Sequence, residues 1–207
     1  DESHILFDIG NRQGESGAVK DASVTLNEDG TVEGWVITMP EYVKKYQPGA
    51  EVPLYFFAQL DKQPEGYGTF AGEKIQPDTR HISGIGSGLY LTYKTNEGES
   101  ITAKVGLSYT SVANARLNLE AEARTFTFDQ AKEAAHQQWE NDLGRIRVET
   151  PVKEDKVKFY TGLYHALLGR GLASDVNGAY PRNDGSVGQI PVKDGKPVHN
   201  LYNTDAA

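Results

Sequence analysis

Hydrophobic and polar residues follow strand-like patterns along about the first 125 positions, which predicts β-strands rather than helices. The expected strands are 5–9, 22–26, 31–39, 54–58, 89–93 and 101–109. Tight turns at 27–30 and 96–99 join two pairs of them, and Asp29-Gly30 is typical of a hairpin. Because 54–58 is apolar throughout, we expect both faces of that strand to be buried. Short strands with no helical period between them predict an antiparallel β-sandwich.

The period changes to a helical one after this region. Thr127 and Gln130 have the spacing of a capping box, in which each side chain bonds the other residue's main-chain N–H. Apolar residues follow at helical intervals, namely Ala131, Ala135, Trp139 and Leu143, before Gly144. This predicts an amphipathic helix that Trp139 anchors.

A second helix is expected after Pro151. Its apolar stripe consists of Val157, Tyr160, Leu163, Tyr164 and Leu167, and it should end near Gly169 or Gly171. Asp, Asn, Gly and Pro then recur without a period from 174 to 200, which predicts a long loop. We therefore divide the chain into a β-sandwich (1–126), a linker helix (127–150) and the start of a helical domain (151–207).

Composition excludes several classes of function. With 21 Lys+Arg against 29 Asp+Glu, a net charge of −8 has the wrong sign for binding nucleic acid. The absence of cysteine excludes disulfides, thiolate zinc sites and cysteine nucleophiles. No apolar run approaches the roughly 18 residues of a membrane span, so we expect none.

Both ends of the sequence have the character of internal segments. Ile5-Leu6-Phe7 already reads as a buried strand, and the last residues form neither a helix nor a polar tail. We therefore expect the chain to be part of a longer protein, with catalytic residues outside it.

Three short motifs have a functional and a structural interpretation. Gly84-Ile85-Gly86-Ser87-Gly88 resembles a phosphate loop but lacks the following Lys-Ser/Thr and helix, so close backbone approach is the better interpretation. Glu120 and Glu122 would share one face of a strand. Such a pair could be the two carboxylates of a glycosidase, but a pair on an exposed strand face is far commoner. His165 is interpreted as a histidine of the core or its boundary, and no Ser-His-Asp arrangement can be argued.

The loop after 174 is the best candidate for binding. Asp175-Val176-Asn177-Gly178 begins like a calcium loop, but Ser186 stands where that pattern needs Glu, which favours an Asx turn. Aromatic rings, amides and carboxylates that suit a carbohydrate site recur along the loop, at Tyr180, Tyr202, Asn177, Asn183, Asn203, Asp175, Asp184 and Asp205. The same composition also suits a solvated loop.

Several stretches together resemble one known family, namely 105–120, Trp139, 158–168, 175–180 and 202–205, with the strand at 3–9 also similar. That family is glycoside hydrolase family 92, the bacterial exo-acting α-mannosidases. The resemblance implies an N-terminal β-sandwich, linker helices and an (α/α)6 barrel, of which only the start is present. The order of strands followed by helices agrees with it.

The resemblance also implies an activity. Family members remove terminal α-linked mannose from glycans with inversion, using a glutamic acid, an aspartate base and Ca²⁺. Inversion requires the two carboxyl groups to lie about 6.5–9.5 Å apart. The acid, the base and the calcium ligands are expected after Ala207, so this chain alone should be inactive and hold no metal. The resemblance further implies a periplasmic, cell-surface or secreted protein.

Tyr202, Asn203 and Asp205 are the residues of this chain that could contact substrate. In the family, this region enters a barrel helix at the mouth of the active site, although ordinary turn chemistry would explain the same residues. The rival interpretations are a non-catalytic sugar-binding β-sandwich and a purely structural domain. The sequence does not indicate an oligomeric state.

Overall fold

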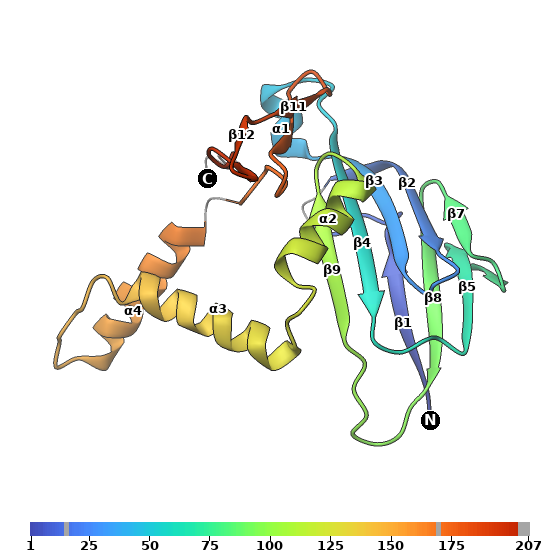
Figure 1. Cartoon of the computed structure of the whole chain (residues 1–207), viewed down its shortest axis with the longest axis horizontal. Helices are drawn as coiled ribbons and strands as arrows, with labels where there is room; N and C mark the ends of the chain where they lie inside the picture. Colours follow the sequence, from blue (N-terminus) through green and yellow to red (C-terminus); the bar gives the residue numbers. More distant parts are fainter. Residues whose placement is uncertain (15–16, 169–170, 203–207) are drawn as a thin grey trace.

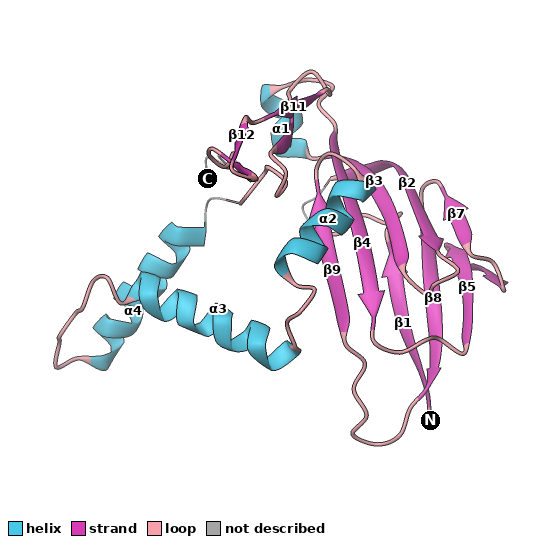
Figure 2. Cartoon of the chain, viewed as in Figure 1, coloured by secondary structure: helices cyan, strands magenta, loops and turns pink. Residues whose placement is uncertain are grey.

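The computed structural model describes residues 1–14, 17–168 and 171–202, and its first half consists of two antiparallel sheets (Figures 1 and 2). The smaller sheet has the order β1-β8-β5-β6, formed by Glu2–Asp8, Ser87–Lys94, Gly66–Ala71 and Lys74–Pro77. The larger has the order β7-β2-β3-β4-β9, formed by His81–Ser83, Ala18–Leu26, Val32–Met39, Val52–Leu60 and Ala103–Ser108. The predicted β-sandwich, followed by helices, is confirmed.

The two predicted tight turns are present, and the first of them forms the predicted hairpin. The amide of Asn27 donates to the carbonyl of Thr31 at 2.8 Å, and Gly30 has a φ of 84°, which favours glycine. At the second turn, the amide of Glu99 donates to the carbonyl of Asn96 at 3.1 Å. The first turn pairs β2 with β3, whereas the second lies on the connection from β8 of the smaller sheet to β9 of the larger.

The sandwich core lies between the inner faces of the two sheets. Its buried members are Val24, Leu26, Val32, Phe56, Ala58, Leu89, Leu91 and Tyr93. Phe7 of the smaller sheet stacks on Phe56 of the larger, with ring centroids 6.0 Å apart. Phe56 and Phe57 are both buried although they point to opposite faces of β4, as the continuous apolar run predicted.

Helix α2 (Val112–Glu122) explains why the outer face of β4 is buried. Its Ala115 and Leu119 pack on Phe57, and the helix lies across β4 and β9 (Figure 1). Ser111 caps the helix by accepting a hydrogen bond from the amide of Asn114 at 3.0 Å. The expectation that no helix interrupts the first 125 residues was wrong here and at the short α1 (Glu41–Tyr46). Glu120 and Glu122 therefore belong to a helix and not to one face of a strand.

The two later helices were predicted correctly. α3 (Phe128–Leu143) begins with the expected capping box between Thr127 and Gln130, and Gly144 is its C-cap. α4 spans Lys153–Leu168 and packs against α3. Trp139 is the anchor between them, since its ring lies 4.7 Å from that of Tyr164. His165 is exposed, so its assignment to a core or boundary was wrong, because α4 contacts only α3 extensively among the described residues.

Residues 171–202 contain more structure than the predicted loop. β10 (Ala179–Pro181) and β11 (Val187–Gln189) form one hairpin, and β12 (Val192–Lys193) and β13 (Lys196–Pro197) form another. The strands are only two or three residues long, which is too short to show a period in the sequence.

The glycine-rich segment 84–88 is a close-packed turn. Gly10 donates to the carbonyl of Ser87 at 2.7 Å, and its own carbonyl accepts from Gly86 at 2.8 Å. A Cβ on Gly10 would lie 2.2 Å from the amide nitrogen of Ser87. The interpretation as close backbone approach is confirmed.

Replacing Tyr93 by phenylalanine should stabilise the protein. Its side chain is fully buried, and within the described part of the chain its hydroxyl has no hydrogen-bond partner. Burial, and secondarily the charge of Asp61, raises the pKa of Tyr93 to about 12. Removing the hydroxyl should raise the free energy of unfolding by about 1 kcal/mol, measured by guanidinium titration at pH 7.

The same residue predicts a dependence on alkaline pH. Because the pKa of the folded state lies above the unfolded value of about 10, the unfolded chain loses its proton first. Stability should therefore fall between about pH 10 and 12, by about 2–3 kcal/mol from this group. Tyr93→Phe should reduce the fall; an identical pH profile in both proteins would contradict the assignment.

The 207-residue chain should self-associate through α4. Val157, Leu167 and Leu168 are each about half exposed there. Such a cluster of apolar side chains favours association in water. Changing all three to glutamine should convert associated protein to monomer in multi-angle light scattering. As a control, Lys132, Glu133 and Lys156 changed to glutamine should leave association intact, and a monomeric unmodified chain would contradict the prediction.

Candidate functional site

The best-formed polar site surrounds Asp175, where residues 172–178 meet β9 and α2. Asp175 is only 4% exposed, although its side chain is an ionisable carboxyl group. Ser108 at the end of β9 donates to its Oδ2 at 3.0 Å, and the Thr110 hydroxyl donates to the same oxygen. Asn118 of α2 donates to Oδ1 at 2.7 Å. One buried carboxyl group thus joins a strand, a helix and the later loop.

Neighbouring amides extend this network. Asn118 also donates to the carbonyl of Leu107 and accepts from the amide of Val176 at 2.9 Å. Asn177 donates to Asn114 Oδ1 at 2.9 Å, and Asn114 donates to Thr110 at 2.7 Å. Each polar group that enters the buried region has a partner, which is the arrangement of a rigid structural connection.

The Asx-turn interpretation of Asp175 was wrong. Its main chain makes an ordinary turn, in which Gly178 donates to its carbonyl at 2.8 Å, while its side chain binds the sandwich. Asx geometry occurs instead at Asn177 and Asp184, whose side chains accept from Ala179 and Ser186 two residues later. The hydroxyl and amide of Ser186 lower the pKa of Asp184 below its ordinary value.

Tyr202 lies close to this network through the main chain. It forms an isolated antiparallel bridge with Leu172, and its side chain is half exposed. Ala173 donates to the carbonyl of Leu201 at 2.9 Å, and Leu201 donates to Ser174 Oγ at 3.0 Å. The other two predicted contact residues, Asn203 and Asp205, lie outside the described residues.

A cavity of about 320 Å³ adjoins the network. It is lined by parts of β4, β9, α2 and residues 172–175, including Leu54, Gly106, Glu122 and Asp175. Glu122 is exposed and Glu120 pairs with Arg116 across one helical turn at 2.9 Å. The two glutamates therefore do not act as the pair considered from the sequence.

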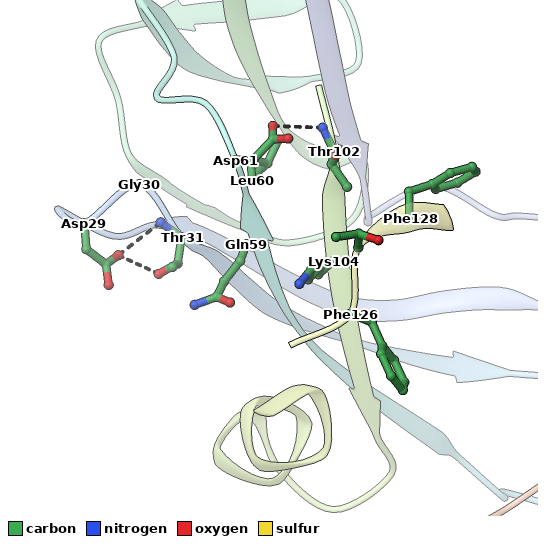
Figure 3. A pocket seen from close by; sticks show the side chains of 11 residues that line it. Asp29, Gly30, Thr31, Gln59, Leu60, Asp61, Thr102, Lys104, Phe126 and Phe128 are labelled. Carbon is green, nitrogen blue, oxygen red and sulfur yellow. Dashed lines mark hydrogen bonds between the residues drawn. The ribbon is translucent and has the colours of Figure 1, made fainter. Parts of the chain in front are cut away.

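A second cavity, of about 600 Å³, lies where α2 leads into α3 (Figure 3). Asp29 accepts from the hydroxyl and amide of Thr31, which lowers its pKa, and Asp61 accepts from the amide of Thr102 at 2.8 Å. Lys104 donates to the carbonyls of Ala123 and Arg124. The rings of Phe126 and Phe128 point away from the polar side chains in Figure 3. The charged side chains of the lining, Asp29, Asp61 and Lys104, are thus already hydrogen-bonded to neighbouring parts of the chain.

The described residues lack the cluster of ligands that a metal site requires. Among 1–14, 17–168 and 171–202, no three His, Cys, Asp or Glu side chains are grouped so as to hold a metal ion. Three protein donors already bind the carboxyl oxygens of Asp175, which ties this group into the local hydrogen-bond network. In the same described ranges, no helix is long and apolar enough to cross a bilayer.

Sequence reasoning found the loop but missed the network. Ser108, Thr110, Asn114 and Asn118 recur at short intervals, which was the available signal for one polar face. Asp175 is the common acceptor for Ser108, Thr110 and Asn118, and it lies 57 to 67 residues away in sequence, so the pattern could not identify it.

Two family models match the chain in succession. The glycosyl hydrolase family 92 N-terminal domain matches residues 1–108, and the family 92 catalytic domain matches residues 114–206. Among curated proteins, no sequence matches.

Solved structures with the same fold include several family 92 enzymes. The α-mannosidase BT3965 from Bacteroides thetaiotaomicron has a TM-score of 0.83 at 22% identity, over 98% of this chain and 26% of that one. The family 92 glycosyl hydrolase ccman5 gives 0.81 at 23% identity, with the same coverage. The inverting mannosidase BT2199 from Bacteroides thetaiotaomicron gives 0.79 at 20%, over 99% and 26%. This chain thus spans about a quarter of their length, and it belongs to glycosyl hydrolase family 92.

Proposed function

We propose that the complete protein is a glycoside hydrolase that removes terminal α-linked mannose from glycans with inversion. The succession of the N-terminal and catalytic family models along one chain is the observation that supports it most. The structural neighbours point the same way, since BT3965 is an α-mannosidase with a structure in complex with mannoimidazole, and BT2199 is an inverting mannosidase.

The reaction needs two carboxyl groups separated by about 6.5–9.5 Å, one to protonate the leaving oxygen and one to activate water. The carboxylates at the two cavities described above are bonded to local structure or lack a facing partner. We assign the acid and base to the protein beyond this chain, and expect residues 1–207 alone to be inactive.

This chain would contribute a rigid support for that catalytic part. The Asp175 network fixes the segment 172–178 against β9 and α2, and the bridge to Leu172 places Tyr202 beside it. Tyr202 is half exposed, so its ring is free to contact a sugar, and we keep Tyr202, Asn203 and Asp205 as the proposed substrate contacts.

Ca²⁺ is the proposed cofactor, with ligands outside this chain. As a hard cation it takes oxygen ligands, including the hydroxyls of a sugar. Among the described residues no three such ligands are grouped, which supports assigning its binding to the protein beyond this chain. A periplasmic, cell-surface or secreted location belongs to the same proposal, since glycans are its substrates.

The test is mannose release by the complete protein from α-mannosides, compared with β-mannosides and α-glucosides. We expect release from α-mannosides alone, loss with EDTA and recovery with added Ca²⁺. Cleavage of only the other substrates would contradict the proposal. Activity that survives chelation would contradict the metal requirement, and an active 207-residue chain would contradict the placement of the acid and base.

A further inference from the structure

The outer face of the smaller sheet carries a hollow that the proposed active site does not use. Its volume is about 510 Å³, and we call it the outer hollow; its lining is Glu2, His4, Glu65, Gly66, Tyr67, Pro77, Asp78, Tyr90, Thr92 and Lys94. Helix α2 covers part of the larger sheet, but among the described residues no helix packs on the smaller one (Figure 1). Within the described residues, the outer hollow therefore lies on a sheet face that no helix covers.

The strand register explains why this face is hollowed. Gly66 lies opposite Thr92 and Gly68 opposite Tyr90, so these two positions of β5 place no side chain on the outer face. A Cβ on Gly66 would come no closer than 3.5 Å to Thr92, so the floor there is open. The glycines thus form a trough between the side chains of β8 and β6.

Tyr90 lies across this trough. A Cβ on Gly68 would meet its hydroxyl oxygen at 2.5 Å and a ring carbon at 2.7 Å, so the ring rests over the neighbouring strand. Phe70 rests in the same way over Gly88, where a Cβ would lie 2.1 Å from its ring. Rings that lie over a sheet offer a face to a ligand. That face is electron-rich and attracts the weakly positive C–H groups of a sugar ring.

Polar groups around Tyr90 suit the hydroxyls of such a ligand. Glu65 lies 3.1 Å from Lys94, and Glu2 lies 3.4 Å from His4, so both donors and acceptors of hydrogen bonds stand at the rim. His4 also shares a hydrogen bond with Thr92 at 3.2 Å. Glu2, Glu65 and Asp78 outnumber Lys94, so the lining disfavours phosphates and other anions.

We propose that the outer hollow is an accessory binding site for a neutral glycan, in which a sugar ring stacks on Tyr90. A glycosidase gains from such a site because a second attachment to a polymeric substrate raises the local concentration of chain ends. This benefit rests on the proposed function, whereas the stacking surface and the rim are features of this chain itself.

The test is affinity electrophoresis of the complete protein through gels that contain α-mannan, xylan or mixed-linkage β-glucan. We expect at least one polysaccharide to retard it. Tyr90→Ala should weaken that binding about tenfold, or ~1.4 kcal/mol. Gly66→Val should weaken it similarly by filling the floor, while Tyr90→Phe should retain most of it.

Tyr46→Ala is the matched control, since Tyr46 is 80% exposed on α1, away from the outer hollow. It should bind like the unmodified protein. Retardation by no polysaccharide, or equal retardation of Tyr90→Ala, Gly66→Val and the unmodified protein, would overturn the proposal. The proposal would also be overturned if the protein bound a basic peptide but no polysaccharide, and if the same variants abolished that peptide binding.

Hydrolysis of a small aryl α-mannoside separates this proposal from the proposed function. Tyr90→Ala and Gly66→Val should leave that rate unchanged, because a substrate of one sugar cannot span both sites. A large loss of that rate in both variants would place the outer hollow in the active site and overturn an accessory role. A protein that binds polysaccharide there yet cleaves no mannoside would contradict the proposed function alone.

Discussion

Replacing Gly106 by alanine is expected to destabilise the protein by about 3 kcal/mol, because α2 lies directly on the main chain of β9 at this position. A Cβ there would lie 2.1 Å from the carbonyl oxygen of Ala115 and 2.7 Å from the Cβ of Leu119. The first of these is main chain, so the helix would have to move away. Its contact with Phe57 would open as a result.

Guanidinium unfolding followed by circular dichroism measures this effect. The experiment uses the variant with glutamine at 157, 167 and 168, so that self-association does not interfere. Gly66→Ala is the matched control, because a Cβ there reaches Thr92 only at 3.5 Å. It should change the unfolding midpoint little. If the two variants unfolded at the same denaturant concentration, the close packing of α2 on β9 would be wrong.

Replacing Asp175 by alanine is expected to release residues 171–202 from the sandwich. The change leaves Ser108, Thr110 and Asn118 without their common acceptor in a buried place, at a cost of about 3 kcal/mol. Hydrogen exchange of β10 and β11 should accelerate about a hundredfold, while β2 and β3 keep their protection. Asp175→Asn should have a smaller effect, because one oxygen still accepts.

Asp184→Ala is the control for this experiment. That carboxylate is exposed, and among the described residues its side-chain hydrogen bonds go to Ser186 two residues away, so its removal should affect the local turn alone. Equal exchange rates in Asp175→Ala and the unmodified chain would show that the network does not hold the segment.

The regular parts of the fold were predictable because their signals are local. The turn at 27–30 and the capping box at Thr127 each lie within a few residues, and both are present. The apolar run of β4 also indicated burial on both faces correctly. It did not reveal that a helix provides the outer cover, because α2 buries only Ala115 and Leu119 and so shows little amphipathic period.

The sites were less predictable because they depend on distant pairs. Asp175 binds residues 57 to 67 positions away, and the outer hollow requires Gly66 and Gly68 to stand beside β8. In both cases, the residues next to one partner in the sequence do not indicate which distant residue it will contact. Glu120 and Glu122 were wrongly predicted to share a face, because the segment was taken for a strand and is a helix.

The most direct test of the central claim is the proton NMR spectrum of the first product that the complete protein releases from an α-mannoside. Hydrolysis with inversion predicts that β-mannose forms first and that α-mannose appears only later, by mutarotation. Initial release of α-mannose, or no mannose at all, would contradict the account.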